Sequence, residues 1–294
     1  MTFSVYPQTP FFRAQNNDRY YRQEIINTIQ KITNRKLIVY EANIWNPAKE
    51  SSISLDDIQP FVDLLYKIEK DSDIDLLLNS AGGDIDAAEK IVYMCREHSK
   101  SFRVIIPEYA KSAATLIALA SDVIVMGPTS ELGPIDPQLY GPGPSGGIFQ
   151  TSAQSFLDEF EQIKKEVEEK GELSPAYYPL LEGLNIGFIG MCRNLIERSR
   201  QFAEKWLKYS MCKDDEERAH KIASQLCDAK KWLTHGVVID AQEAQNLGIK
   251  VESFSLDDKF WQHIWFLHCC YGSVFRQKPL SKIFESDSVS LPIT

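Results

Sequence analysis

Short apolar runs that alternate with helical runs are the feature that most constrains how this chain can fold. Four of them have the composition of buried strands: KLIVYEA at 36–42, IDLLLN at 74–79, FRVIIP at 102–107 and DVIVM at 122–126. Amphipathic or alanine-rich runs separate them. Strands that alternate with helices pair in parallel through right-handed crossovers, so the sequence predicts an α/β fold with a parallel sheet.

The segments around these strands divide the chain into five parts. An amphipathic run at 18–33 opens the fold, and a nearly all-helical segment follows the strands. We expect the polar end of the chain to be partly disordered. The predicted parts are an N-terminal helical arm (1–35), a βα core (36–150), a helical segment (151–228), a return to the core (229–254) and a C-terminal helix and tail (255–294).

Charge and cysteine content exclude several classes of partner. The formal net charge is −9 with no basic tract, which argues against nucleic acid as a partner. No segment reaches the roughly 18 apolar residues of a membrane span, and the first residues lack a signal-peptide core, so we expect a cytoplasmic protein without a membrane partner. Reduced thiols are expected, and the pair Cys269–Cys270 beside His268 does not predict a metal site. No G-x-G-x-x-G follows a strand, so no cofactor is predicted.

Ser112 stands at a strand-to-helix junction, between FRVIIP and the alanine-rich run at 113–121. A serine there can simply cap the helix, because its oxygen accepts a bond from an unpaired helical N–H. It can also be a nucleophile on a sharp turn, which requires small neighbours such as Ala110 and Ala114. Ser112 alone does not separate the two readings.

Gly82 and Gly83 follow the strand at 74–79, one βα turn before Ser112. A glycine pair permits positive φ and lets backbone N–H groups face a ligand. Consecutive βα turns meet at the carboxyl edge of a parallel sheet, where open α/β folds bind ligands. Together the two turns predict an acyl-transfer site.

Three stretches of the chain resemble the serine dehydrogenase proteinase family: LLLNSAGGDIDAAEKIV, AKSAATLIALASDVIVMGPTSELGPIDPQ and KKWLTHGVVIDAQEAQNLGIKVESF. These serine peptidases share the Clp-protease fold with signal peptide peptidase A, and the resemblance spans roughly 18–285. It implies a Clp/crotonase-like fold of βα units with a large helical insertion, and homo-oligomers. Carried onto the matching positions, it implies Ser112 as nucleophile and Gly83 and Ala113 as N–H donors of an oxyanion hole, with Gly82 shaping the turn.

The general base is the part of the site for which the resemblance offers no matching residue. In the Clp subunit a histidine stands in the loop after the next strand, where this chain has Asp136, and signal peptide peptidase A uses a lysine that has no counterpart at 146–156. His235, in a loop before the return to the sheet, suits general-base chemistry. Lys111 is adjacent to Ser112, although neighbouring side chains diverge, and Lys164 and Lys165 remain further candidates.

The sequence therefore favours a cytoplasmic serine endopeptidase that acts on peptides or loosened proteins through an acyl-enzyme on Ser112. One alternative is a crotonase-type enzyme that applies the same oxyanion donors to a thioester. The other is a catalytically silent scaffold within a larger assembly. Because Clp-fold relatives associate through such helices, the resemblance also implies that the helical residues 152–227 supply much of an oligomer interface.

Overall fold

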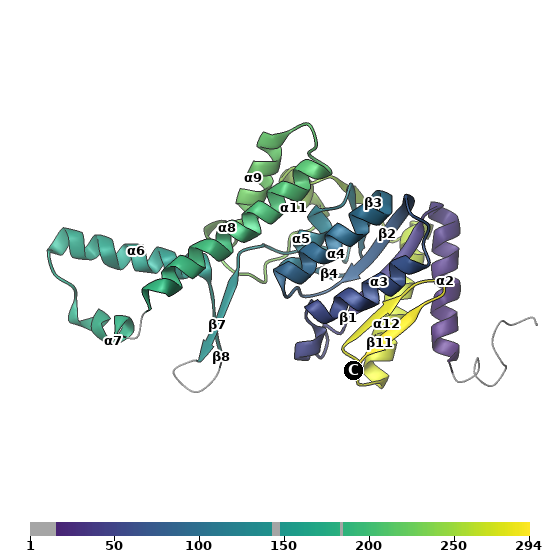
Figure 1. The fold of residues 1–294 in the computed structure, drawn as a ribbon, viewed down its shortest axis with the longest axis horizontal. Coiled ribbons are helices and arrows are strands. Elements are labelled where there is room, and N and C mark those ends of the chain that lie inside the picture. Colours follow the sequence, from purple (N-terminus) through teal and green to yellow (C-terminus); the bar gives the residue numbers. More distant parts are fainter. Residues whose placement is uncertain (1–15, 143–147, 183–184) are drawn as a thin grey trace, which may run out of the picture.

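The computed structural model describes residues 16–142, 148–182 and 185–294, and a seven-stranded sheet forms its centre (Figure 1). The strand order is β11-β10-β1-β2-β3-β5-β9. The neighbouring strands from β1 to β9 in this order pair parallel, whereas β10 pairs antiparallel with both β1 and β11. The bounds are β1 (Lys36–Ala42), β2 (Ser72–Asn79), β3 (Ser99–Ile106), β5 (Val123–Met126), β9 (Val251–Ser253), β10 (Lys282–Glu285) and β11 (Ser290–Ile293).

The predicted α/β class with a mainly parallel sheet is confirmed, and its register explains the unbroken apolar runs. One row of aligned residues crosses four strands on one face: Val39, Leu77, Ile105 and Val125. The neighbouring row lies on the opposite face: Ile38, Leu76, Val104 and Ile124. All eight side chains are buried, so both faces of these strands must be apolar.

Helices cover both faces of the sheet (Figure 1). On one face, α3 (Ile58–Tyr66), α4 (Ile85–His98) and α5 (Ala113–Leu119) pack into the larger hydrophobic cluster. On the other face, α2 (Asn17–Thr33) and α12 (Lys259–Gln277) form the second cluster, with Ile26 and Trp261 fully buried. The sheet is therefore the middle of three layers, and its carboxyl edge is left to the loops.

A helical extension projects from the core (Figure 1). The hairpin of β7 (Gln138–Pro142) and β8 (Ile148–Ser152) leads to α6 (Ala153–Lys170), α7 (Tyr178–Leu181) and α8 (Ile186–Tyr209). The end of α8 returns to the main core through Phe202 and Trp206, while α6 and the start of α8 share a small separate cluster. The chain then forms α9 (Glu216–Cys227), α10 (Ala229–Trp232) and α11 (Ala241–Asn246), with β4 (Tyr109–Ala110) and β6 (Glu131–Leu132) as a separate pair. Short 3-10 turns lie at Lys49–Ser51, Leu55–Asp57 and Pro175–Tyr177.

The end of the chain differs from the sequence-based expectation, because the predicted partly disordered tail forms β10 and β11 of the central sheet. Ile283 and Phe284 are buried there. Lys282 and Glu285 are buried as well, and they form ion pairs with Asp57 and Arg22. The charged residues of the tail made it look polar in sequence. They can be buried because their ion-pair partners lie elsewhere in the chain. Residues 1–15 of the predicted helical arm lie outside the described residues.

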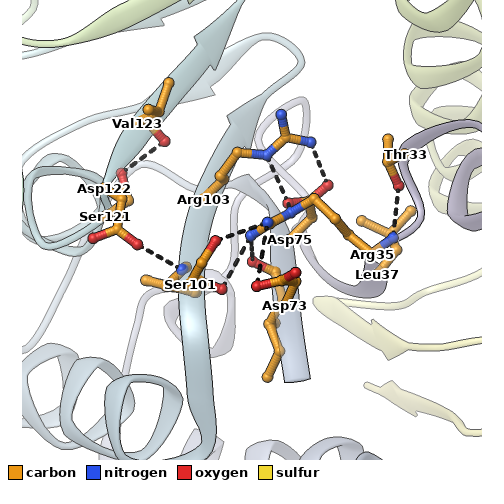
Figure 2. Close-up of polar contacts among 12 residues, drawn as sticks. Thr33, Arg35, Leu37, Asp73, Asp75, Ser101, Arg103, Ser121, Asp122 and Val123 are labelled. Atoms are coloured by element: carbon orange, nitrogen blue, oxygen red, sulfur yellow. Dashed lines mark hydrogen bonds and ion pairs between the residues drawn. The ribbon is translucent and has the colours of Figure 1, made fainter. Parts of the chain in front are cut away.

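A buried ionic cluster fixes the amino-terminal half of β2 and β3 (Figure 2). Asp75 is 1% exposed and accepts hydrogen bonds from Arg35 and Arg103. Arg35 also donates to Ser101 and to the Ile74 carbonyl. A buried carboxylate requires such partners, so these charges are committed to holding the strands in register. The opposite, carboxyl edge carries the candidate site.

Candidate active site

Ser112 occupies a strained turn between β4 and α5. Its backbone has φ 52° and ψ −119°, a positive φ that non-glycine residues rarely adopt. It stands at the N-cap position of α5, yet its side chain makes no capping hydrogen bond. Strain of this kind persists only where the surroundings impose it, as at exposed nucleophiles on sharp turns.

The glycine pair lies directly against this turn. Gly82 has φ +102°, and a Cβ placed on it would lie 2.8 Å from Ser112 Cβ. A Cβ on Gly83, at φ +150°, would lie 2.3 Å from the Ile53 carbonyl oxygen. Only glycine fits at either position, because both the conformation and the space exclude a side chain.

The hydrogen bonds of the glycine turn set the direction of the Gly83 N–H. Ile53 N–H donates to the Gly82 carbonyl at 2.9 Å, and Asp84 N–H donates to the Ile53 carbonyl at 2.8 Å. In a trans peptide the N–H points opposite to the C=O, so the Gly83 N–H points away from Ile53. Gly82, Gly83, Ser112 and Ala113 all line one cavity of about 480 Å³.

His235 lines the same cavity and is paired with Asp136. Its Nδ1 lies 2.7 Å from Asp136 Oδ1, and Gln138 Nε2 donates to Asp136 Oδ2 at 2.6 Å. The Asp136 side chain is only 4% exposed. An ionised carboxylate only accepts hydrogen bonds, so Nδ1 of His235 carries a proton, and in the neutral imidazole Nε2 is the nitrogen with the lone pair. Ser112 and His235 thus line one cavity, and the Asp136 carboxylate contacts the side of His235 that carries Nδ1.

Asp136 is the residue whose role the sequence did not reveal. Asp136 stands in the loop after β5 at the position where the resemblance leads us to expect a histidine, and its partner His235 lies 99 residues further along the chain. The available signal was an acidic residue in the loop after β5 and a histidine in the loop before the return to the sheet. Only the folded structure shows that these two side chains are in contact.

Lys111 is buried, and its ammonium contacts backbone carbonyls. Its Nζ donates to the Leu132 oxygen at 3.0 Å and the Val237 oxygen at 2.8 Å, and it lies 3.1 Å from Glu131 Oε1. Burial lowers the pKa of Lys111, and Glu131 opposes that shift. The three ammonium hydrogens therefore have three acceptors, all outside the Ser112 turn.

The other sequence candidates lie away from this cavity. Lys164 and Lys165 on α6 are exposed and pair with glutamates of the same helix, as the predicted solvated face requires. His268 is buried between Glu41 and Glu108. In the described part of the chain, no group of three or more His, Cys, Asp or Glu side chains is arranged to hold a metal ion. Over the same residues, no helix combines the length and the apolar character that crossing a bilayer requires.

Comparison with known families identifies residues 50–170 as a match to the ClpP-like SDH-type serine proteinases. This match confirms the family resemblance seen in the sequence motifs. Two uncharacterized proteins of Methanocaldococcus jannaschii are also similar. One is 31% identical over 204 residues, covering 68% of this chain and 61% of its own length. The other is 28% identical over 201 residues, covering 68% and 59%. The chain thus spans about 60% of the length of these relatives.

Solved structures with a similar fold include two proteases. A membrane-bound stomatin-specific protease aligns over 71% of this chain and 76% of its own, with 19% identity and a TM-score of 0.39. ClpP1 from Listeria monocytogenes aligns over 77% of this chain and 96% of its own, with 13% identity and a TM-score of 0.36.

Proposed function

We propose, from the match to the ClpP-like serine proteinases and from the groups around the cavity, that this chain is a serine endopeptidase acting through an acyl-enzyme on Ser112. The observation that carries the proposal is the His235–Asp136 pair at the cavity that Ser112 also lines. A serine hydroxyl is a weak nucleophile until a neighbouring base takes its proton, and His235 supplies that base.

In the proposed mechanism these groups divide the steps of peptide hydrolysis among them. His235 Nε2 takes the Ser112 proton as Oγ attacks the scissile carbonyl, while Asp136 holds the Nδ1–H and stabilises the imidazolium. The N–H groups of Gly83 and Ala113 donate to the oxyanion of the tetrahedral intermediate. His235 then protonates the leaving amine, and a water activated by His235 hydrolyses the acyl-enzyme.

Neighbouring cavities support an extended peptide as substrate. The main cavity shares Ser52 and Ala81 with a second one of about 270 Å³. It also shares Gln138 and His235 with a third one of about 380 Å³. Cavities that adjoin the one at Ser112 give an extended peptide room beyond the two residues of a scissile bond, which an endopeptidase needs.

A thioester-acting enzyme and a silent scaffold explain less of the site. A thioester enzyme of the crotonase type needs the oxyanion donors but neither a serine at the turn nor a His–Asp pair beside it. A scaffold needs none of these groups, and would not retain a strained serine that caps nothing.

Labelling with a fluorophosphonate probe tests the proposal. Ser112→Ala removes the attacking oxygen, so labelling is expected to disappear while far-UV circular dichroism stays unchanged. Ser224→Ala, on α9 away from the cavity, is the matched control and should label like the wild type. Full labelling of Ser112→Ala would overturn the assignment, and absence of labelling in the wild type would favour the scaffold.

Assembly and location belong to the same proposal. The projecting helices expose apolar side chains, among them Ile186 and Tyr178, which supports a homo-oligomer built through this extension. Sedimentation is expected to give a species larger than the 33.5 kDa chain at micromolar concentration, and a monomer would contradict it. Cell fractionation, with the protein in the soluble cytoplasmic fraction, is the corresponding test of location.

A further inference from the structure

Two loops meet behind the Ser112 turn, and Lys111 is bound to both. Leu132, whose carbonyl it contacts, comes four residues before Asp136. Val237, whose carbonyl it also contacts, comes two residues after His235. The segment around Asp136 and the segment around His235 are therefore attached to one ammonium group.

The two loops also contact each other at this point. Leu132 N–H donates to the Ile239 carbonyl at 2.9 Å, and Ile239 N–H donates to the Leu132 carbonyl at 3.1 Å. The Leu132 oxygen thus accepts from both Ile239 and Lys111. A charge-assisted bond from a buried cation is stronger than a neutral one, so Lys111 reinforces this junction where water is excluded.

Gly133 makes room for the lysine stem. A Cβ on Gly133 would lie 2.4 Å from Lys111 Cδ, and the next nearest atoms, both of Lys111, are at 3.4 Å. Gly133 has no positive φ that would demand glycine for conformational reasons. Glycine at position 133 therefore leaves the space that the Lys111 side chain occupies.

We propose that Lys111 is a positioning residue that holds the Asp136 loop and the His235 loop in register with the nucleophile. This inference rests on the proposed function. Lys111 and Ser112 share a peptide bond, so the backbone that places the nucleophile also sets the position of the two loops that supply its base. The ammonium acts through carbonyl oxygens and takes no proton from Ser112.

Lys111→Met tests the role, because methionine keeps much of the apolar stem and removes the donor. Acylation by the fluorophosphonate probe is expected to slow about 100-fold, the scale of a displacement near 1 Å at a reacting centre. The pH at which acylation reaches half its maximum should stay in place, because His235 remains the base. If the rise of the acylation rate with pH disappeared in Lys111→Met, Lys111 would be the base, and the proposal would be overturned. A lower melting temperature with an unchanged acylation rate would also overturn it.

Proton NMR gives a readout that does not depend on turnover. The hydrogen-bonded Nδ1–H of His235 should give a low-field resonance that is absent in His235→Ala. Lys111→Met is expected to shift or broaden it, while the low-field protons of His268 serve as an internal reference. An unchanged His235 resonance would overturn the proposal even if Ser112 proved not to be a nucleophile. Retained labelling in Ser112→Ala would overturn the proposed function instead, so the two failures are distinguishable.

Gly133→Ala provides a second variant should Lys111→Met fail to fold. The new methyl group would displace the lysine stem, so acylation is expected to slow in the wild-type background. In a Lys111→Ala background the clash disappears, and Gly133→Ala should have no further effect on the rate. Additive losses in the double variant would show that Gly133 acts independently of Lys111, and would overturn the proposal.

Discussion

His268 and His235 both contact carboxylates, and they differ in how many of their ring nitrogens those carboxylates occupy. His268 is 2% exposed, with Nδ1 2.8 Å from Glu41 Oε1 and Nε2 3.0 Å from Glu108 Oε2. Burial alone would lower its pKa, but the two carboxylates raise the pKa of His268 to about 10. His235 has one carboxylate partner, Asp136, and borders a cavity.

The difference distinguishes a structural histidine, His268, from the proposed catalytic one, His235. His268 stays protonated near neutral pH and ties α12 to β1 and to the segment after β3, because both of its nitrogens donate. His235 has one nitrogen committed to orientation and the other available to substrate. A single carboxylate orients an imidazole, whereas a second one removes its capacity to accept a proton.

The largest expected effect on acylation is at His235. His235→Ala removes the base, and acylation of Ser112 should slow by about 10²–10⁴-fold. His268→Gln, measured at a temperature where it is folded, should acylate at close to the wild-type rate. Probe-labelling kinetics of the two variants measure the contrast. Equal losses in both would mean that His235 contributes only structure.

A smaller loss is expected at Asp136. Asp136→Asn keeps the shape but offers an amide in place of an acceptor-only carboxylate, so the Nδ1–H tautomer of His235 is no longer enforced. Acylation should slow by less than on removal of the base itself, because in a Ser-His-Asp site loss of the carboxylate costs roughly two orders of magnitude less than loss of the histidine. The rate is measured across pH 5–9. A wild-type rate in Asp136→Asn would show that His235 needs no orienting partner.

The smallest effect on acylation and the clearest effect on stability belong to His268. A histidine whose pKa rises on folding stabilises the fold fully below its unfolded pKa, about 6.5, and that contribution is lost as pH rises towards 10. Burial also raises the pKa of Glu41, which acts in the same direction. The free energy of unfolding should therefore fall between pH 6.5 and 10 more steeply in the wild type than in His268→Gln. Denaturant titrations at several pH values measure the slopes, and parallel slopes would contradict the assignment.

The parts of the site set by local backbone were readable from the sequence. A glycine pair after one strand and a serine with small neighbours after the next carry their geometry in consecutive residues. The apolar runs likewise revealed the strands, since both faces of a parallel sheet are buried. These features need no knowledge of distant partners.

The parts set by long-range pairing were not readable. Asp136 is an ordinary loop aspartate until His235 is placed beside it, and Lys111 is an ordinary lysine until two carbonyls surround its ammonium. Lys282 and Glu285 gave the last strands a polar character in sequence. The partners that allow their burial lie more than 200 residues away, so the sequence did not reveal it. Tertiary contacts decide each of these roles.

The pairing of β1 with β10 has a consequence for the synthesis of this chain. Val39 pairs with Glu285, a separation of 285 − 39 = 246 residues. At ribosomal rates of about 5–20 residues per second, β1 waits roughly 10–50 s for the strand that covers its edge. Throughout that interval Arg22 and Asp57 also lack their charged partners. The nascent chain thus presents an open, aggregation-prone strand edge until residues 282–285 have been translated.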